Sequence, residues 1–296
     1  MTTTKSIKRA TDGQKNQIAA ILGALVKDLV GEADVDREGA QKLIGDAGTF
    51  KATLREPLMA AIRAHGTTNR FASEEEVAST FTYPAEYTGA KPLGVQASIL
   101  RQDFPGLVLV NEDLATKPLI TGAEGKFVIP LWQKVAPTYG QAVELVISKI
   151  KDKRTVYNFR DGQLGPNHLR QSTRSTEMWD KLAKQQEGHD LLVVDAQFGL
   201  RHRGRSIRRA REIFASNEFG FGAFAGLIMH LTHPEREVRW EQLHSDFAGD
   251  EYAPDAGGVF SKAPYCYFGD GGFEFSTFDV GSPSDDFGAV SGFLPE

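Results

Sequence analysis

The sequence predicts a mixed α/β protein with a partly parallel sheet, a helical N-terminal portion and an acidic, β-rich C-terminal portion. Three observations predict this class. Apolar residues recur at helical spacing near the N-terminus, short apolar runs alternate with helical patterns in the middle, and the C-terminal segment carries tyrosine and phenylalanine among glycine and aspartate. With 296 residues, of which 41% are hydrophobic and 25% charged, the chain can form one large or two ordinary domains.

Shifts in composition divide the chain into three parts. Residues 1–66 are predicted to form the helical portion, and residues 67–240 a mixed α/β domain. Residues 241–296 form the acidic, β-rich portion, which we expect to pack on the α/β domain.

The N-terminal portion is predicted to contain three helices. Asp12 can cap the first of them, in which an apolar stripe runs from Ile18 to Leu29 and ends near Gly31. Two further helices are expected over residues 36–44 and 49–64. We expect their apolar stripes to form the core of a small bundle or cap.

The middle of the chain alternates strand and helix patterns. The strongest strand signal is the apolar run from Asp190 to Val194, and a helical pattern follows it over residues 206–216. Strands separated by helices of this length favour a mixed sheet with a parallel portion. Further strands are expected over residues 107–110, 126–132 and 155–159, and further helices over residues 138–150 and 176–184.

Beyond residue 217 two more patterns complete the prediction. An apolar run that ends near Leu231 predicts a buried helix. The last part of the chain predicts two or three antiparallel strands joined by tight turns.

The charges are segregated along the chain. The net charge is −5, but residues 151–211 carry 14 basic and 7 acidic side chains, whereas residues 241–296 carry 1 basic and 11 acidic ones. Either the two segments are surfaces for different partners, or the acidic end lies over the basic middle and neutralises it.

Composition also excludes several classes of protein. A single cysteine, Cys266, rules out an internal disulfide and a four-cysteine zinc site, which favours a reducing compartment. The longest apolar runs are shorter than the roughly 20 residues that a membrane span requires. We therefore expect a cytoplasmic protein without a membrane-spanning segment.

One segment carries a recognisable chemical pattern. The residues from Gly199 to Ser206 read G-x-x-x-x-G-R-S, which is a degenerate P-loop with Arg205 in place of the lysine. A strand before the segment and a helix after it are the context in which glycine-rich loops bind phosphate. Arginine is not interchangeable with lysine at such a site, and no later strand ending in aspartate is evident.

Arginines are concentrated in and just after this loop. Their guanidinium groups can hold phosphate, so we predict a binding site for nucleic acid, a nucleotide or another phosphate-bearing ligand. The alternative is that the arginines pair with carboxylates of the acidic end, such as Asp246, Asp250, Glu251 or Asp255. The predicted site consists of Gly199, Arg201, Arg203, Gly204, Arg205, Ser206, Arg208 and Arg209.

A second basic stretch flanks Tyr157 and Phe159 and includes Lys151, Lys153 and Arg160. If the strands before residues 160 and 195 were parallel neighbours, the loops after them would meet at one edge of the sheet. Such a basic cleft with aromatic rings would suit single-stranded nucleic acid. Alternatively, the two rings face the core.

Histidines and acidic residues cluster after the buried helix. His230, His233, His244 and Asp246 are candidate metal ligands, because three histidines beside carboxylates can form a metal site with an open position. The cluster carries no established metalloprotease motif.

Three hypotheses for function follow. The first is a protein that binds nucleic acid or a phosphate-bearing ligand, and the second is a metal-assisted or nucleotide-dependent hydrolase. The third is an assembly protein that forms homo-oligomers through contacts between the basic middle of one subunit and the acidic end of another.

Overall fold

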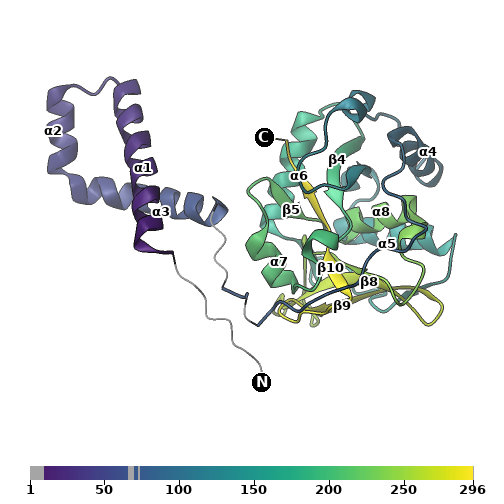
Figure 1. The fold of residues 1–296 in the computed structure, drawn as a ribbon. Helices are drawn as coiled ribbons and strands as arrows, with labels where there is room; N and C mark the ends of the chain where they lie inside the picture. The colour runs from purple at the N-terminus through teal and green to yellow at the C-terminus, as the bar shows by residue number, and fades with distance from the viewer. Residues whose placement is uncertain (1–9, 66–69, 73, 296) are drawn as a thin grey trace. The chain divides into compact units, whose positions relative to one another are not determined.

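The structure is a computed structural model that describes residues 10–65, 70–72 and 74–295 (Figure 1). The chain divides into two compact units, residues 1–68 and 69–296. Helices and both parallel and antiparallel strand pairs are present, with helices at the N-terminal end and strands concentrated towards the C-terminal end. The predicted α/β class is therefore confirmed.

The N-terminal unit consists of three helices near the predicted positions. Thr11 caps the first with a capping box, and Asp36 caps the second by accepting a hydrogen bond from the backbone N–H of Gly39. The helices are α1 (Asp12–Glu32), α2 (Arg37–Gly45) and α3 (Ala47–His65).

The apolar stripe of α1 is not part of a core. No residue of α1 or α2 is buried, and Ile21 is 68% exposed while Leu25 and Leu29 are each 50% exposed. Within this unit, the stripes of α1 and α2 therefore do not form the buried core that the sequence predicts. The periodicity of the sequence specifies an amphipathic helix, but it does not specify what covers the apolar face.

Two sheets form the framework of the second unit. The first has the strand order β1-β4-β11-β5, and all of its pairs are antiparallel. Every residue of its central strand β4 is buried, which explains the uninterrupted apolar run in the sequence. The strands are β1 (Gly125–Pro130), β4 (Leu191–Gln197), β5 (Glu218–Gly220) and β11 (Ser291–Phe293).

The second sheet contains the parallel pairs. Its order is β10-β6-β8-β7-β3, with β9 paired to β8 and β2 paired to β9. Only β6 with β10 and β2 with β9 run parallel in the described structure. The strands are β2 (Val156–Asn158), β3 (Leu169–Gln171), β6 (His244–Asp246), β7 (Asp250–Tyr252), β8 (Lys262–Gly269), β9 (Gly272–Asp279) and β10 (Phe287–Ala289).

The expected basic cleft depended on β2 and β4 being parallel neighbours. The structure places β2 in the second sheet and β4 in the first, so that prediction of a shared sheet edge is wrong. Local patterns identified both strands, but strand pairing depends on contacts between distant segments.

Helices pack around and between these sheets. Helix α8 (Ala223–Thr232) is buried at every residue, as predicted, and contacts α5 (Tyr139–Lys151) and β1. Gly226 permits this packing, because a Cβ atom there would lie 2.1 Å from the ring of Phe247. The remaining helices of this unit are α4 (Leu93–Asp103), α6 (Thr173–Gln185) and α7 (Ile207–Ile213), with short 3₁₀ helices η1 (Glu112–Thr116), η2 (Trp132–Lys134), η3 (Leu200–His202) and η4 (Pro234–Arg236).

One predicted strand does not form. In residues 107–110 only Val110 makes a bridge, to Leu191, and Val108 and Leu109 are more than half exposed. Apolar composition alone therefore misidentified this segment. None of the helices in the described residues has the length and apolar character needed to cross a bilayer.

Candidate functional site

The arginine-rich loop connects β4 to α7, as the sequence predicted. Ser206 caps α7 by accepting a hydrogen bond from the backbone N–H of Arg209. In a P-loop the backbone N–H groups would point at a phosphate. Here several of them bond within the chain: Gly199 to the side chain of Gln197, Leu200 to the hydroxyl of Tyr83, Gly204 to the carbonyl of Phe287 and Ser206 to the carbonyl of Glu75.

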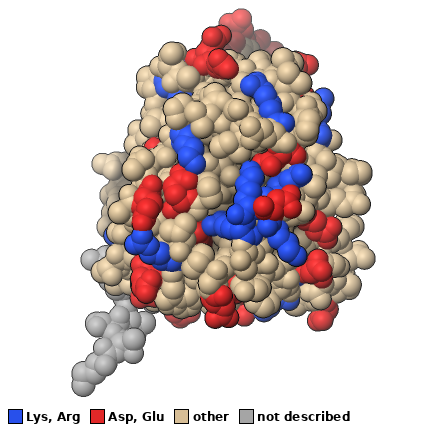
Figure 2. Space-filling model, turned by 90° about the vertical axis from the view of Figure 1, so that its right-hand side faces the viewer, with Lys and Arg blue, Asp and Glu red and all other residues tan. Residues whose placement is uncertain are grey.

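The arginine side chains also have partners within the chain. Most of these partners are glutamates that lie outside the acidic C-terminal end. The face drawn in Figure 2, which is the right-hand side of the view in Figure 1, also has basic side chains next to acidic ones. Phosphate binding at this loop stays a prediction, and it would have to compete with these contacts. The contacts are Arg201 with Glu218, Arg203 with the carbonyl of Phe81, Arg205 with Glu76, Arg208 with Glu75, Arg209 with Glu76 and Glu212, and Arg211 with the carbonyls of Ala248 and Asp250.

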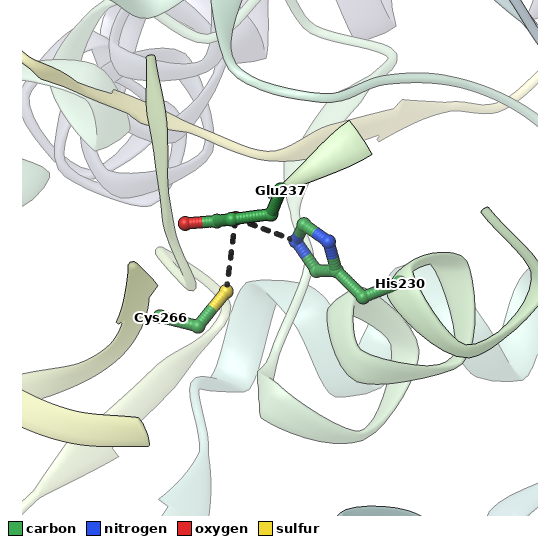
Figure 3. A group of neighbouring side chains, drawn as sticks. All are labelled: His230, Glu237 and Cys266. Atoms are coloured by element: carbon green, nitrogen blue, oxygen red, sulfur yellow. Dashed lines mark hydrogen bonds and ion pairs between the residues drawn. The ribbon is translucent and has the colours of Figure 1, made fainter. Parts of the chain in front are cut away.

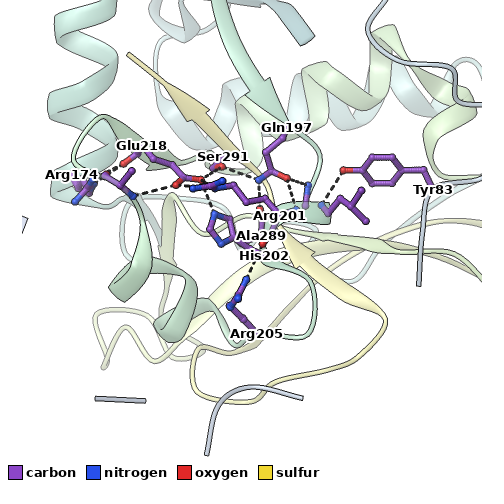
Figure 4. Close-up of polar contacts among 12 residues, drawn as sticks. Tyr83, Arg174, Gln197, Arg201, His202, Arg205, Glu218, Ala289 and Ser291 are labelled. Carbon is purple, nitrogen blue, oxygen red and sulfur yellow. Dashed lines mark hydrogen bonds and ion pairs between the residues drawn. The ribbon is translucent and has the colours of Figure 1, made fainter. Parts of the chain in front are cut away.

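A buried polar network fixes the loop to the first sheet (Figure 4). His202 and Ser291 both donate to the carboxylate of Glu218, at 2.6 and 2.7 Å, and Gln197 donates to the hydroxyl of Ser291. Burial opposes ionisation of Glu218, but the hydrogen bonds and nearby positive charges outweigh it and lower its pKa. Burial lowers the pKa of His202, although the hydrogen bond to Glu218 acts in the opposite direction.

We expect Arg209 to contribute to stability. Its side chain is 7% exposed and lies 2.5 Å from Glu76 and 2.9 Å from Glu212. Arg209→Ala should therefore lower the free energy of unfolding by about 3 kcal/mol, because the buried carboxylate of Glu212 and the partly exposed one of Glu76 lose their counter-ion. Lys134→Ala, which removes an exposed pair, should cost less than about 1 kcal/mol. Urea unfolding of the two variants measures the difference, and equal losses would contradict an internal role for Arg209.

The predicted metal ligands do not converge as a group. His230 and His244 both contact the carboxylate of Glu237, at 3.3 and 2.9 Å. His233 points elsewhere, since its Nε2 accepts a hydrogen bond from the backbone N–H of Lys91. Asp246 forms no hydrogen bond with this cluster.

Glu237 is the centre of the cluster (Figure 3), and the sequence analysis missed it. The ligand atoms of His230, Glu237 and Cys266 lie within 4.8 Å of one another, and all three residues are fully buried. The carboxylate accepts hydrogen bonds from His244, Ser245 and the Cys266 thiol, and Nε2 of His230 lies 3.3 Å from it. Burial and the charge of Glu237 raise the pKa of Cys266, which keeps it a thiol. These contacts satisfy the carboxylate without a metal ion.

A cavity of about 220 Å³ lies on the second sheet beside Asp246. Asp246 is only 7% exposed. Its carboxyl group forms no hydrogen bond or ion pair with any described residue. Burial, helped by the charges of Asp286 and Glu237, raises the pKa of Asp246 to about 8. The other lining residues are Tyr265, Phe278, Ser282, Ser284 and Phe287.

The walls of this cavity belong to an aromatic face of the second sheet. Alternation along β8 places Tyr265 and Tyr267 on one face, with ring centroids 5.7 Å apart. The ring of Phe287 packs against both, and Phe278 is 45% exposed beside Tyr265. In Figure 1 the hairpin of β8 and β9 lies along the lower edge of the second unit.

Acidic side chains near this face are not neutralised by basic ones. Among the described acidic residues from 241 to 295, only Glu251 forms an ion pair, with Arg170. The acidic end therefore does not neutralise the arginine-rich loop through side-chain ion pairs. The aromatic walls were also missed, although alternating aromatics in a strand pattern were visible in the sequence.

Comparison of the chain with protein-family models, with curated proteins and with solved structures finds no significant match in any of the three.

Proposed function

We propose that this protein binds a small organic cation, whose ammonium group lies beside Asp246. The observation that carries the proposal is the buried, unpartnered carboxyl group of Asp246 at the 220 Å³ cavity. A buried polar group without a partner is costly. An ammonium ion would supply both a compensating charge and hydrogen-bond donors.

The rest of the cavity has the composition of a cation site. The rings of Tyr265, Phe278 and Phe287 present aromatic surface, which attracts cations through the negative face of the ring. The hydroxyl oxygens of Ser282 and Ser284 can accept hydrogen bonds from an ammonium group. A carboxylate ligand would be repelled, because Asp286 adds a second acidic group near Asp246.

Isothermal titration calorimetry with three matched probes tests this function. We expect benzylammonium to bind, benzyl alcohol to bind at least about tenfold more weakly, and benzoate not to bind. The pKa of Asp246 is about 8 without ligand, so its carboxyl group is largely protonated at neutral pH. Binding of an ammonium group beside it should therefore displace the proton of Asp246 into solution. The measured enthalpy should then vary with the ionisation enthalpy of the buffer. Binding of benzoate as tight as that of benzylammonium would refute the proposal.

A second candidate is the binding of single-stranded nucleic acid or another phosphate-bearing ligand. The observation that favours it is the exposure of Tyr157 (41%) and Phe159 (57%), which do not face the core and are followed in the sequence by Arg160. Exposed rings next to cations can stack bases while the cations contact phosphates. Oligonucleotide binding that weakens steeply with salt and is lost in Tyr157→Ser would support this candidate.

A further inference from the structure

We infer that the bound cation is a linear molecule with two or more ammonium groups, such as a free polyamine. The inference rests on the proposed function, because it extends the Asp246 cavity by a neighbouring hollow. This second hollow encloses about 500 Å³. Its walls include Trp240, Tyr267, Asp270 and Glu274.

The two hollows are neighbours on one sheet. Tyr265 lines the first and Tyr267 the second, and their ring centroids are 5.7 Å apart. Phe287 contacts both rings, at 5.3 and 6.5 Å between centroids. A ligand chain leaving one hollow therefore crosses aromatic surface before it reaches the other.

The second hollow has the chemistry of a second ammonium site. Trp240 is 56% exposed, and its ring lies 5.8 Å from that of Tyr267, so two aromatic faces are available to a cation. Glu274 is only 2% exposed, and neither it nor Asp270 forms an ion pair with a described residue. Burial raises the pKa of Tyr267, and its side-chain hydrogen bond to Glu274 and the charge of that carboxylate raise it further.

Strand register sets the spacing between the two acidic groups. Asp246 lies opposite Tyr265, and Glu274 lies opposite Tyr267, on the strands that flank β8. Two strand spacings and two residues along the strand separate their Cα atoms by about 12 Å. Several methylene groups must therefore separate the two nitrogens of the ligand.

Titrations with amines of increasing length test the inference. We expect diaminooctane or spermidine to bind at least about tenfold more tightly than butylammonium, and diaminopropane to show no such gain. Trp240→Ala should reduce the affinity for the long diamine to that for butylammonium. Val259→Ala is the control, because its side chain is 80% exposed and lines neither hollow, so the gain should persist.

The outcomes separate the two proposals. If no amine binds, the proposed function fails. If butylammonium binds but diamine length and Trp240→Ala have no effect, only the two-site inference fails. A short peptide with two lysines that binds more tightly than every free amine would overturn the assignment to a free polyamine and indicate a protein partner.

Discussion

Asp246→Asn should weaken the binding of benzylammonium at least about a hundredfold and abolish the proton release that accompanies it. Asparagine keeps the size of the side chain but cannot supply the negative charge that the ammonium group needs. Titration calorimetry in two buffers of different ionisation enthalpy measures both effects. Asp279→Asn is the matched control, because Asp279 is an exposed aspartate of the same acidic segment and lines neither hollow. Unchanged binding in Asp246→Asn would place the cation elsewhere.

The same substitution should change how stability depends on pH. Burial raises the pKa of Asp246 to about 8 and that of Asp250 to about 7, whereas the unfolded chain has ordinary values. The folded state therefore binds more protons than the unfolded state between about pH 4 and 8. The contribution of these two aspartates to the free energy of unfolding is greatest below the pKa that they have in the unfolded chain. It is lost as the pH rises through their pKa values in the folded protein.

Asp246→Asn should remove a large part of this loss of stability with rising pH. At about pH 9 the variant should be more stable than the unsubstituted protein by roughly 3–6 kcal/mol, because no charge is buried there. At about pH 4 the two proteins should differ little. Urea unfolding at both values checks the result, and parallel pH profiles would show that Asp246 is not the group responsible.

Local patterns in the sequence were sufficient to predict most helices and the central strand. The capping residue Thr138 and the apolar periodicity after it specify α5, and the unbroken apolar run before Asp195 specifies β4. These features depend on residues within one turn or one strand. They can be read without knowing what the segment packs against.

The arrangement of the site depends on distant contacts, which the sequence does not display. The partners of Arg205 and Arg209 include Glu76, more than 120 residues earlier in the chain. Charge counts suggested the nearer acidic end as an alternative partner, but geometry pairs these arginines with a different segment. Likewise, Asp246 was a candidate by residue type, but its cavity exists only because β6, β8 and β10 align.

Gly199→Ala should lower the free energy of unfolding by at least about 3 kcal/mol or prevent folding altogether. The φ angle of Gly199 is +120°, a conformation that other residues adopt only with strain. A Cβ atom there would also lie 2.6 Å from the carbonyl oxygen of Gly288, which belongs to β10. Neither the backbone of Gly288 nor the strand that holds it can move freely, so both costs apply together.

Gly165→Ala is the matched control for this prediction, since its Cβ would have no atom within 4 Å and its φ is not positive. We expect the free energy of unfolding of the control to lie within about 1 kcal/mol of that of the unsubstituted protein. The contrast tests why the P-loop-like pattern contains a glycine at position 199. If Gly199→Ala folds normally and loses only phosphate binding, the glycine serves a ligand. If stability is lost without any ligand present, close packing of the loop against β10 is sufficient to require it.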